Sequence, residues 1–146
     1  MSSSKCDAMS SRILIVEDEM MVAMEMEAVI EDLGFLPIGI AADSVQALEL
    51  ARETPDLALV DLHLRDGLTG PSVGEELARR GIGVVFITAN PRIVATGVPG
   101  ALGVAEKPCD ERTIASIIEF AIGHRKGEQI APPPGFKPFS GSVAAN

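Results

Sequence analysis

Four short apolar runs, each followed directly by polar residues, constrain the fold of this chain more than any other feature. The runs cover residues 13–16, 57–60, 84–87 and 101–105. The polar residues that follow them are Glu17 and Asp18, Asp61, Thr88, and Glu106 with Lys107. In an open parallel sheet the carboxyl ends of the strands lie along one edge, where ligands bind. We therefore expect carboxylates, a hydroxyl and an ammonium group to meet in one cleft.

The segments between the runs have helical periodicity, which predicts an alternation of strands and helices. Strands are expected at 12–16, 35–41, 57–60, 84–87 and 101–105, and helices at 19–33, 43–52, 71–80 and 110–124. Pro37 suits a strand only at a sheet edge or near the strand start, and Asp43 is placed to cap the second helix. This order predicts a parallel sheet with helices on both faces.

Residues 90–103 do not follow this pattern. They contain three glycines and two prolines in fourteen residues. In a helix each glycine costs roughly 1 kcal/mol and each interior proline roughly 3 kcal/mol. We expect a mobile segment here in place of a full helix.

The two ends of the chain are expected to lie outside the domain at 12–125. Residues 1–11 are polar and predict a flexible leader. Residues 126–146 are rich in proline and glycine and predict an extended or disordered tail. Phe136 and Phe139 are two apolar residues of this tail that could dock on the domain.

Charge and composition exclude several classes of function. The chain has 12 basic and 21 acidic residues and a formal charge of -9, which argues against a nucleic-acid partner. No apolar stretch approaches the roughly 20 residues that cross a bilayer, and the N-terminus lacks a signal core, so we expect a cytoplasmic protein without a membrane partner. Cys6 and Cys109 are far apart in sequence and are read as free thiols.

The polar residues after the runs suit a divalent metal and a phosphoryl group. Glu17 and Asp18 are paired carboxylates that favour a hard cation such as Mg²⁺, although acidic residues are also common at the start of a helix. Asp61 alone would be an ordinary turn residue. Beside Asp18, its carboxylate could attack a phosphoryl donor and form an acyl phosphate, with charge neutralised by the metal. Thr88 and Lys107 could then bind the phosphoryl oxygens.

With these residues in place, the chain resembles a response-regulator receiver domain of two-component signalling. The matching residues are Ile13-Leu14-Ile15-Val16-Glu17-Asp18, Leu59-Val60-Asp61-Leu62, Phe86-Ile87-Thr88-Ala89 and Glu106-Lys107-Pro108. The resemblance covers about residues 12–124. It implies an α/β, flavodoxin-like, doubly wound (βα)5 sandwich with a five-stranded parallel sheet. Residues 86–90 with 95–97 resemble a divergent, mainly alphaproteobacterial subgroup whose fourth helix is short or irregular.

The resemblance also implies a role for each matching residue. Asp61 would be the phosphoacceptor, and Mg²⁺ would bind Asp61, Asp18, Glu17 through water, and the backbone carbonyl of His63. Thr88, Ala89 and Lys107 would bind the phosphoryl group, with Thr88 moving on activation and Pro108 following a cis peptide bond. The His63 side chain could be a metal ligand or a base, but we favour a place at the cleft rim that tunes the access of water.

Three positions depart from the family pattern. Val104 stands where receivers usually carry an aromatic switch residue, which puts the usual coupling of that residue to Thr88 in doubt. Arg65 replaces a frequent proline, and Cys109 replaces a frequent phenylalanine. We therefore expect the chemistry at Asp61 to follow the family. We do not expect the way in which phosphorylation of Asp61 changes the rest of the domain to follow it.

We expect a signalling protein that receives its phosphoryl group from a sensor histidine kinase or histidine phosphotransferase. Only about 22 residues follow the last helix, so the expected output is an unknown partner protein, without a DNA-binding output domain. One alternative is a receiver-like interaction module that is never phosphorylated. Another is an aspartyl-nucleophile phosphatase, which would be an enzyme, but that class needs a second Asp where this chain has His63.

Overall fold

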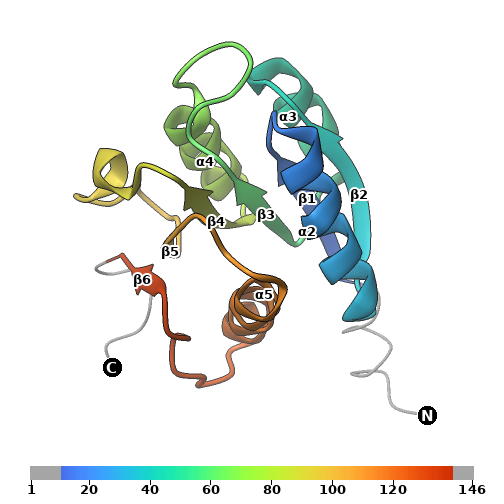
Figure 1. Cartoon of the computed structure of the whole chain (residues 1–146), viewed down its shortest axis with the longest axis vertical. Helices are drawn as coiled ribbons and strands as arrows, with labels where there is room; N and C mark the ends of the chain where they lie inside the picture. The colour runs from blue at the N-terminus through green and yellow to red at the C-terminus, as the bar shows by residue number, and fades with distance from the viewer. Residues whose placement is uncertain (1–10, 140–146) are drawn as a thin grey trace.

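The computed structural model describes residues 11–139, which form one sheet between two layers of helices (Figure 1). The strands are β1 (Arg12–Val16), β2 (Leu36–Ala41), β3 (Leu57–Val60), β4 (Gly83–Thr88), β5 (Gly103–Glu106) and β6 (Phe136–Pro138). The helices are α2 (Met20–Asp32), α3 (Ser44–Leu50), α4 (Gly70–Arg79) and α5 (Glu111–Arg125), with 3₁₀ turns η1 (Ala51–Glu53) and η2 (Pro91–Val94). The strand order is β2-β1-β3-β4-β5-β6.

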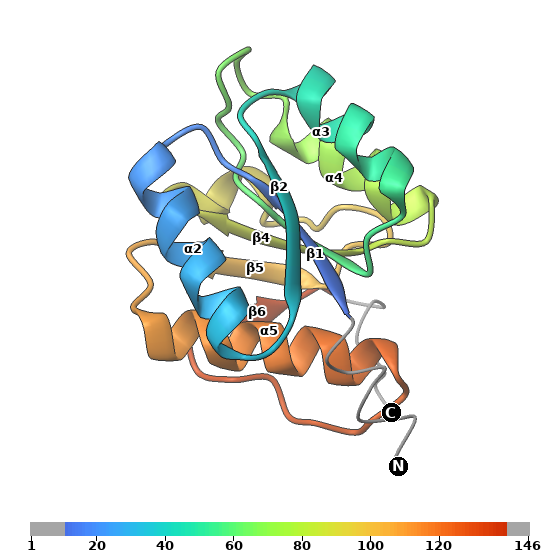
Figure 2. The same cartoon turned by 90° about the vertical axis from the view of Figure 1, so that its right-hand side faces the viewer.

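The five predicted strands all pair in parallel, as the sequence indicated. The central strand β3 is buried along its whole length, which explains its continuous apolar sequence. β2 is an edge strand, so Pro37 is tolerated there. Helices α2 and α5 cover one face of the sheet, and α3 and α4 cover the other (Figure 2). The prediction of an α/β sandwich is confirmed.

Asp43 and Asp110 cap the N-termini of α3 and α5, at the positions where the sequence predicts these helices to begin. The Asp43 carboxylate accepts a 2.8 Å hydrogen bond from the Gln46 amide, and the Asp110 carboxylate accepts one of 2.8 Å from Thr113. Each cap pairs one of the amide groups that a helix leaves without a partner in its first turn. These bonds hold the pKa of both carboxyl groups below its ordinary value.

Residues 90–103 contain no α-helix, in agreement with the sequence. The segment forms the single turn η2 and then a loop up to β5. Gly97 and Gly100 have positive φ angles of 92° and 82°, a conformation that disfavours residues with a side chain. Because of its prolines and glycines, this segment forms a short turn and an irregular loop in place of a helix.

The tail, for which the sequence predicts an extended or disordered segment, contributes a strand to the sheet. Residues 136–138 pair antiparallel with β5, so the sheet has six strands where five were predicted. Gly103 permits this approach, because a side chain there would place Cβ 2.4 Å from the Lys137 carbonyl oxygen. Phe136 and Phe139 dock on the domain, with 7% and 8% of their surfaces exposed. Residues 1–10, most of the expected leader, and residues 140–146 lie outside the described part of the chain.

The helices of the described residues are short or amphipathic. None within 11–139 has the length and apolar character needed to cross a bilayer.

Candidate functional site

Three carboxylates meet at the carboxyl ends of β1 and β3. Glu17 and Asp18 follow β1, and Asp61 follows β3. One oxygen of each carboxylate lies within 4.8 Å of the others. Glu17 is 1% exposed and Asp61 is 8% exposed, whereas Asp18 faces solvent. The predicted convergence of these residues is therefore present, and a cation could reach the group from the side of Asp18.

Lys107, at the end of β5, joins this group as a cation. Its Nζ lies 2.8 Å from Oδ2 of Asp61 and 2.9 Å from Oε1 of Glu17. It also lies 3.3 Å from Oε1 of Glu19. The peptide bond between Lys107 and Pro108 is cis, as expected. The sequence analysis did not assign Glu19 to the site; its only signal was the adjacent acidic pair, which also fits an ordinary helix start.

Burial and like charge oppose the ionisation of Glu17. Burial is the largest cause and, with the negative charge of Asp61, raises the pKa of Glu17 from 4.5 to about 7 against the opposing effect of Lys107. Burial alone would lower the pKa of Lys107, but its contacts with Asp61 and Glu17 outweigh burial and hold that pKa above its ordinary value. Lys107 is therefore a lasting cation at neutral pH, and it cannot act as a base there.

The acidic group fits a divalent cation with oxygen ligands. The contact of Lys107 with Oε1 of Glu17 is an ion pair without hydrogen-bond geometry, and no other donor reaches this buried oxygen from the described residues. A second cation near Glu17, Asp18 and Asp61 would offset the repulsion between their charges. Carboxylate oxygens with open access to water suit Mg²⁺.

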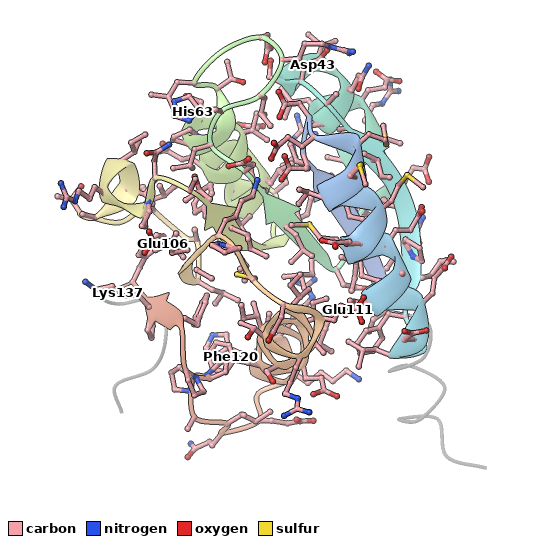
Figure 3. The ribbon with its side chains drawn as sticks, in the orientation of Figure 1. Asp43, His63, Glu106, Glu111, Phe120 and Lys137 are labelled. Atoms are coloured by element: carbon pink, nitrogen blue, oxygen red, sulfur yellow. The ribbon has the colours of Figure 1, made fainter. Side chains whose placement is uncertain are left out.

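A cleft of about 300 Å³ adjoins these groups. Its lining residues are Asp18, Glu19, Asp61, His63, Thr88, Ala89, Asn90 and Lys107. Thr88 is 1% exposed, and its hydroxyl accepts a 3.1 Å hydrogen bond from the Asn90 amide. His63, labelled in Figure 3, is exposed and is one of the residues that line this cleft. The structure thus brings together the residues that the sequence nominated on β1, β3, β4 and β5.

Asp61 is held by its own backbone and by the start of α4. Its Oδ1 accepts a 2.7 Å hydrogen bond from the Leu62 amide. The Gly70 amide donates to the Leu62 carbonyl at 2.9 Å. A side chain at Gly70 would place Cβ 2.1 Å from the Asp61 carbonyl oxygen. The sequence analysis missed Gly70 because a glycine beside Pro71 is common at any helix start.

Val104 lies on the same sheet, away from the acidic group. It is 4% exposed and pairs with Phe86 of β4 on one side and Lys137 of β6 on the other. Val104, which stands where receivers usually carry an aromatic residue, thus lies between β4, which carries Thr88, and the tail strand β6.

Comparison with known proteins agrees with this geometry. The family model of the response regulator receiver domain matches residues 13–119. The phyllosphere-induced regulator PhyR of Methylorubrum extorquens is 36% identical over 118 residues, which are 78% of this chain and 44% of PhyR. The transcriptional regulatory protein PdtaR of Mycobacterium tuberculosis is 30% identical over 121 residues, 79% of this chain and 58% of PdtaR. The chain thus spans less than two thirds of the length of these relatives.

Solved structures give the same result. The response regulator PhyR from Brucella abortus superposes with a TM-score of 0.72 at 30% identity, covering 86% of this chain and 54% of that protein. The receiver domain of Erythrobacter litoralis PhyR gives a TM-score of 0.68 at 32% identity, covering 85% of this chain and 95% of that domain. The chain therefore belongs to the response regulator receiver domain family of bacterial two-component signalling.

Proposed function

We propose that this receiver domain accepts a phosphoryl group on Asp61 from the phosphohistidine of a kinase or phosphotransferase, in the presence of Mg²⁺. One observation carries the proposal: the Asp61 carboxylate lies within 4.8 Å of two further carboxylates and 2.8 Å from the ammonium group of Lys107. Neither the three carboxylates nor the ammonium group would suit phosphoryl transfer without the other. Together they provide a nucleophile, a set of metal ligands and a fixed cation.

The transfer forms one bond and breaks one bond. A carboxylate oxygen of Asp61 attacks phosphorus, the new O–P bond gives an acyl phosphate, and the N–P bond of the donor histidine breaks and leaves its electron pair on nitrogen. Lys107 stays protonated and pairs with the added negative charge. Glu17, Asp18, Asp61 and the His63 carbonyl would hold Mg²⁺, which neutralises charge on the phosphoryl oxygens when bound.

Thr88 and Ala89 complete the proposed phosphoryl site. Thr88 is buried beside the cleft, so its hydroxyl can turn to the phosphoryl group while the backbone after it shifts. The next residues form only a short turn, which supports a readout through residues 90–103. The charge of -9 favours a protein over a nucleic acid as the output partner. We also propose that the protein acts in the cytoplasm.

Incubation with acetyl phosphate and Mg²⁺, followed by intact mass measurement, tests the proposal. We expect the addition of one phosphoryl group, its loss in Asp61→Asn, and its prevention by a chelator. Asp32→Asn, at the far end of α2, is the matched control and should be modified like the unaltered protein. If no donor modifies Asp61, the chain is an interaction module without phosphorylation. Rapid turnover of varied phosphate esters would instead indicate a phosphatase.

A further inference from the structure

The tail residue Phe139 packs against the strand that leads to Thr88. Its ring centroid lies 6.2 Å from that of Phe86, with the two ring planes at 47°. Its amide donates a 2.9 Å hydrogen bond to the Leu102 carbonyl. With 8% of its surface exposed, Phe139 is part of the core on the face of the sheet that α3 and α4 cover.

Phe86 connects this contact to the functional site. It is fully buried on β4, two residues before Thr88, and residues two apart on a strand point to the same face. On its other side the Phe86 ring lies against α4, because a side chain at Gly74 would place Cβ 2.3 Å from Cζ of Phe86. The Phe86 ring is therefore confined between α4 and Phe139.

Phe139 also lies beside the segment that follows Thr88. A side chain at Gly97 would place Cβ 3.7 Å from Cβ and Cγ of Phe139. A cavity of about 470 Å³ is bordered by both this segment and the tail; its wall includes Pro91, Val94, Val104 and Phe139. Glu106 and Lys137 lie on the same side of the molecule as η2 (Figure 3). The small side chain of Val104 leaves this space open, and the aromatic ring that borders it comes from the tail.

Local hydrogen bonds and the buried side chain of Val94 hold the segment in its present position. Residues 91–98 make short turns in which the amides of Ile93, Ala95 and Gly97 donate to carbonyls three residues earlier. The Asn90 amide is tied to the Thr88 hydroxyl at 3.1 Å. If the Thr88 hydroxyl turns toward a phosphoryl group, its hydrogen bond from the Asn90 amide breaks. The backbone at the start of the segment is then free to move.

We propose that Phe139 is a positioning residue that couples Thr88 to the C-terminal tail. When Thr88 turns toward the phosphoryl group on Asp61, residues 91–97 close over the cavity and pack on Phe139, which tightens the tail on β5. This inference rests on the proposed function. Because coupling between sites is reciprocal, the docked tail stabilises the phosphorylated form of the domain by the same factor by which phosphorylation stabilises the docked tail.

Amide hydrogen exchange tests the coupling in the full chain, with acetyl phosphate and Mg²⁺ as the probe. We expect phosphorylation to slow the exchange of peptides covering 91–98 and 134–139 by about five-fold or more. Phe139→Ala should abolish this slowing, and Phe139→Leu should restore part of it, because leucine keeps most of the apolar bulk. The readout is the ratio between the phosphorylated and unmodified forms of each variant, which a uniform loss of stability leaves unchanged.

Phe136→Ala is the matched control. Phe136 belongs to the same tail and is equally buried, but it packs on Phe120 of α5, at a centroid distance of 5.3 Å, on the opposite face of the sheet. Its variant should keep the slowing in residues 91–98. Equal losses in the Phe136 and Phe139 variants, or unchanged tail peptides in the phosphorylated unaltered protein, would overturn the inference alone. Absence of a phosphoryl group on Asp61 would overturn the proposed function as well.

Discussion

Glu17 is the residue where folding and the proposed chemistry oppose each other. Its side chain is almost fully buried, close to the negative charge of Asp61, and its pKa rises to about 7 for this reason. A group selected for stability alone would not be an acid at this position. The free-energy cost of burying the Glu17 carboxylate is understandable if that carboxylate is a metal ligand, because a bound cation offsets its repulsion from Asp61.

Replacement of Glu17 by glutamine should stabilise the metal-free protein at high pH. Between pH 4.5 and 7 the folded state keeps a proton on Glu17 that the unfolded state has lost, so the free energy of unfolding falls as the pH rises. Above pH 7 the full penalty applies, about 3 kcal/mol. Glu17→Gln should therefore be more stable than the unaltered protein at pH 8, and the gain should vanish near pH 4.5.

Urea unfolding at both pH values, with a chelator present, measures this difference. Addition of Mg²⁺ at pH 8 should raise the stability of the unaltered protein more than that of Glu17→Gln. A variant less stable than the unaltered protein at pH 8 without metal would show that the contact of Glu17 with Lys107 outweighs its burial.

At the scale of elements, α4 determines where Asp61 lies. The helix begins at Gly70 directly against the backbone of Asp61 and Leu62, and Gly74 admits the Phe86 ring one turn later. Gly74, inside the helix, reduces helix propensity by roughly 1 kcal/mol, whereas Gly70 is the first residue of the helix. They are tolerated because any side chain at either position would push the helix away from β3 or β4.

Gly70→Ala should destabilise the fold and slow phosphorylation, whereas Gly123→Ala should change neither strongly. At Gly70 the new Cβ meets the backbone, which cannot move without displacing Asp61, at a cost of roughly 1–3 kcal/mol. At Gly123 it meets the side chain of Ile130, which can turn aside while α5 gains helix propensity. Thermal unfolding and the rate of phosphoryl addition from acetyl phosphate measure both effects. If the two variants behaved alike, the close packing of Gly70 against the backbone of Asp61 would not be what positions α4.

At the scale of the whole molecule, the tail is part of the packed structure. Phe136 and Phe139 contribute to the cores on opposite faces of the sheet, and β6 pairs with the edge of β5. An uncovered parallel edge is a site where another chain can pair. We propose that the folded unit extends to Phe139, past the boundary near residue 125 that composition indicated.

Truncation after Gly127 should lower the free energy of unfolding by more than roughly 3 kcal/mol, because two buried phenylalanines are lost. The bare edge of β5 should also promote association at high concentration. Urea unfolding and light scattering after size exclusion measure the two effects. A variant that ends at Phe139 is the control that isolates residues 128–139. Unchanged stability after truncation would show that the tail adds no net stability.

From the sequence alone we predicted the alternating strands and helices, the irregular segment at 90–103 and the residues that meet beyond the strand ends. Those features depend on periodicity, on turn and cap residues, and on the rule that parallel strands end at one edge, all of which are local or general. It also indicated that Val104 breaks the family pattern, without showing what occupies that region.

The packed structure was needed to show that Glu19 reaches Lys107, that Gly70 lies against the backbone of Asp61, and that the tail adds a strand beside β5. The first and third of these contacts join segments distant in the sequence, and the second depends on how the loop after β3 folds. A three-residue strand next to prolines also has no periodicity to reveal it. Burial of Phe136 and Phe139 stabilises that strand because the two faces of the sheet offer apolar partners. Those partners exist only once the helices have packed, which is why the sequence could nominate these residues but not place them.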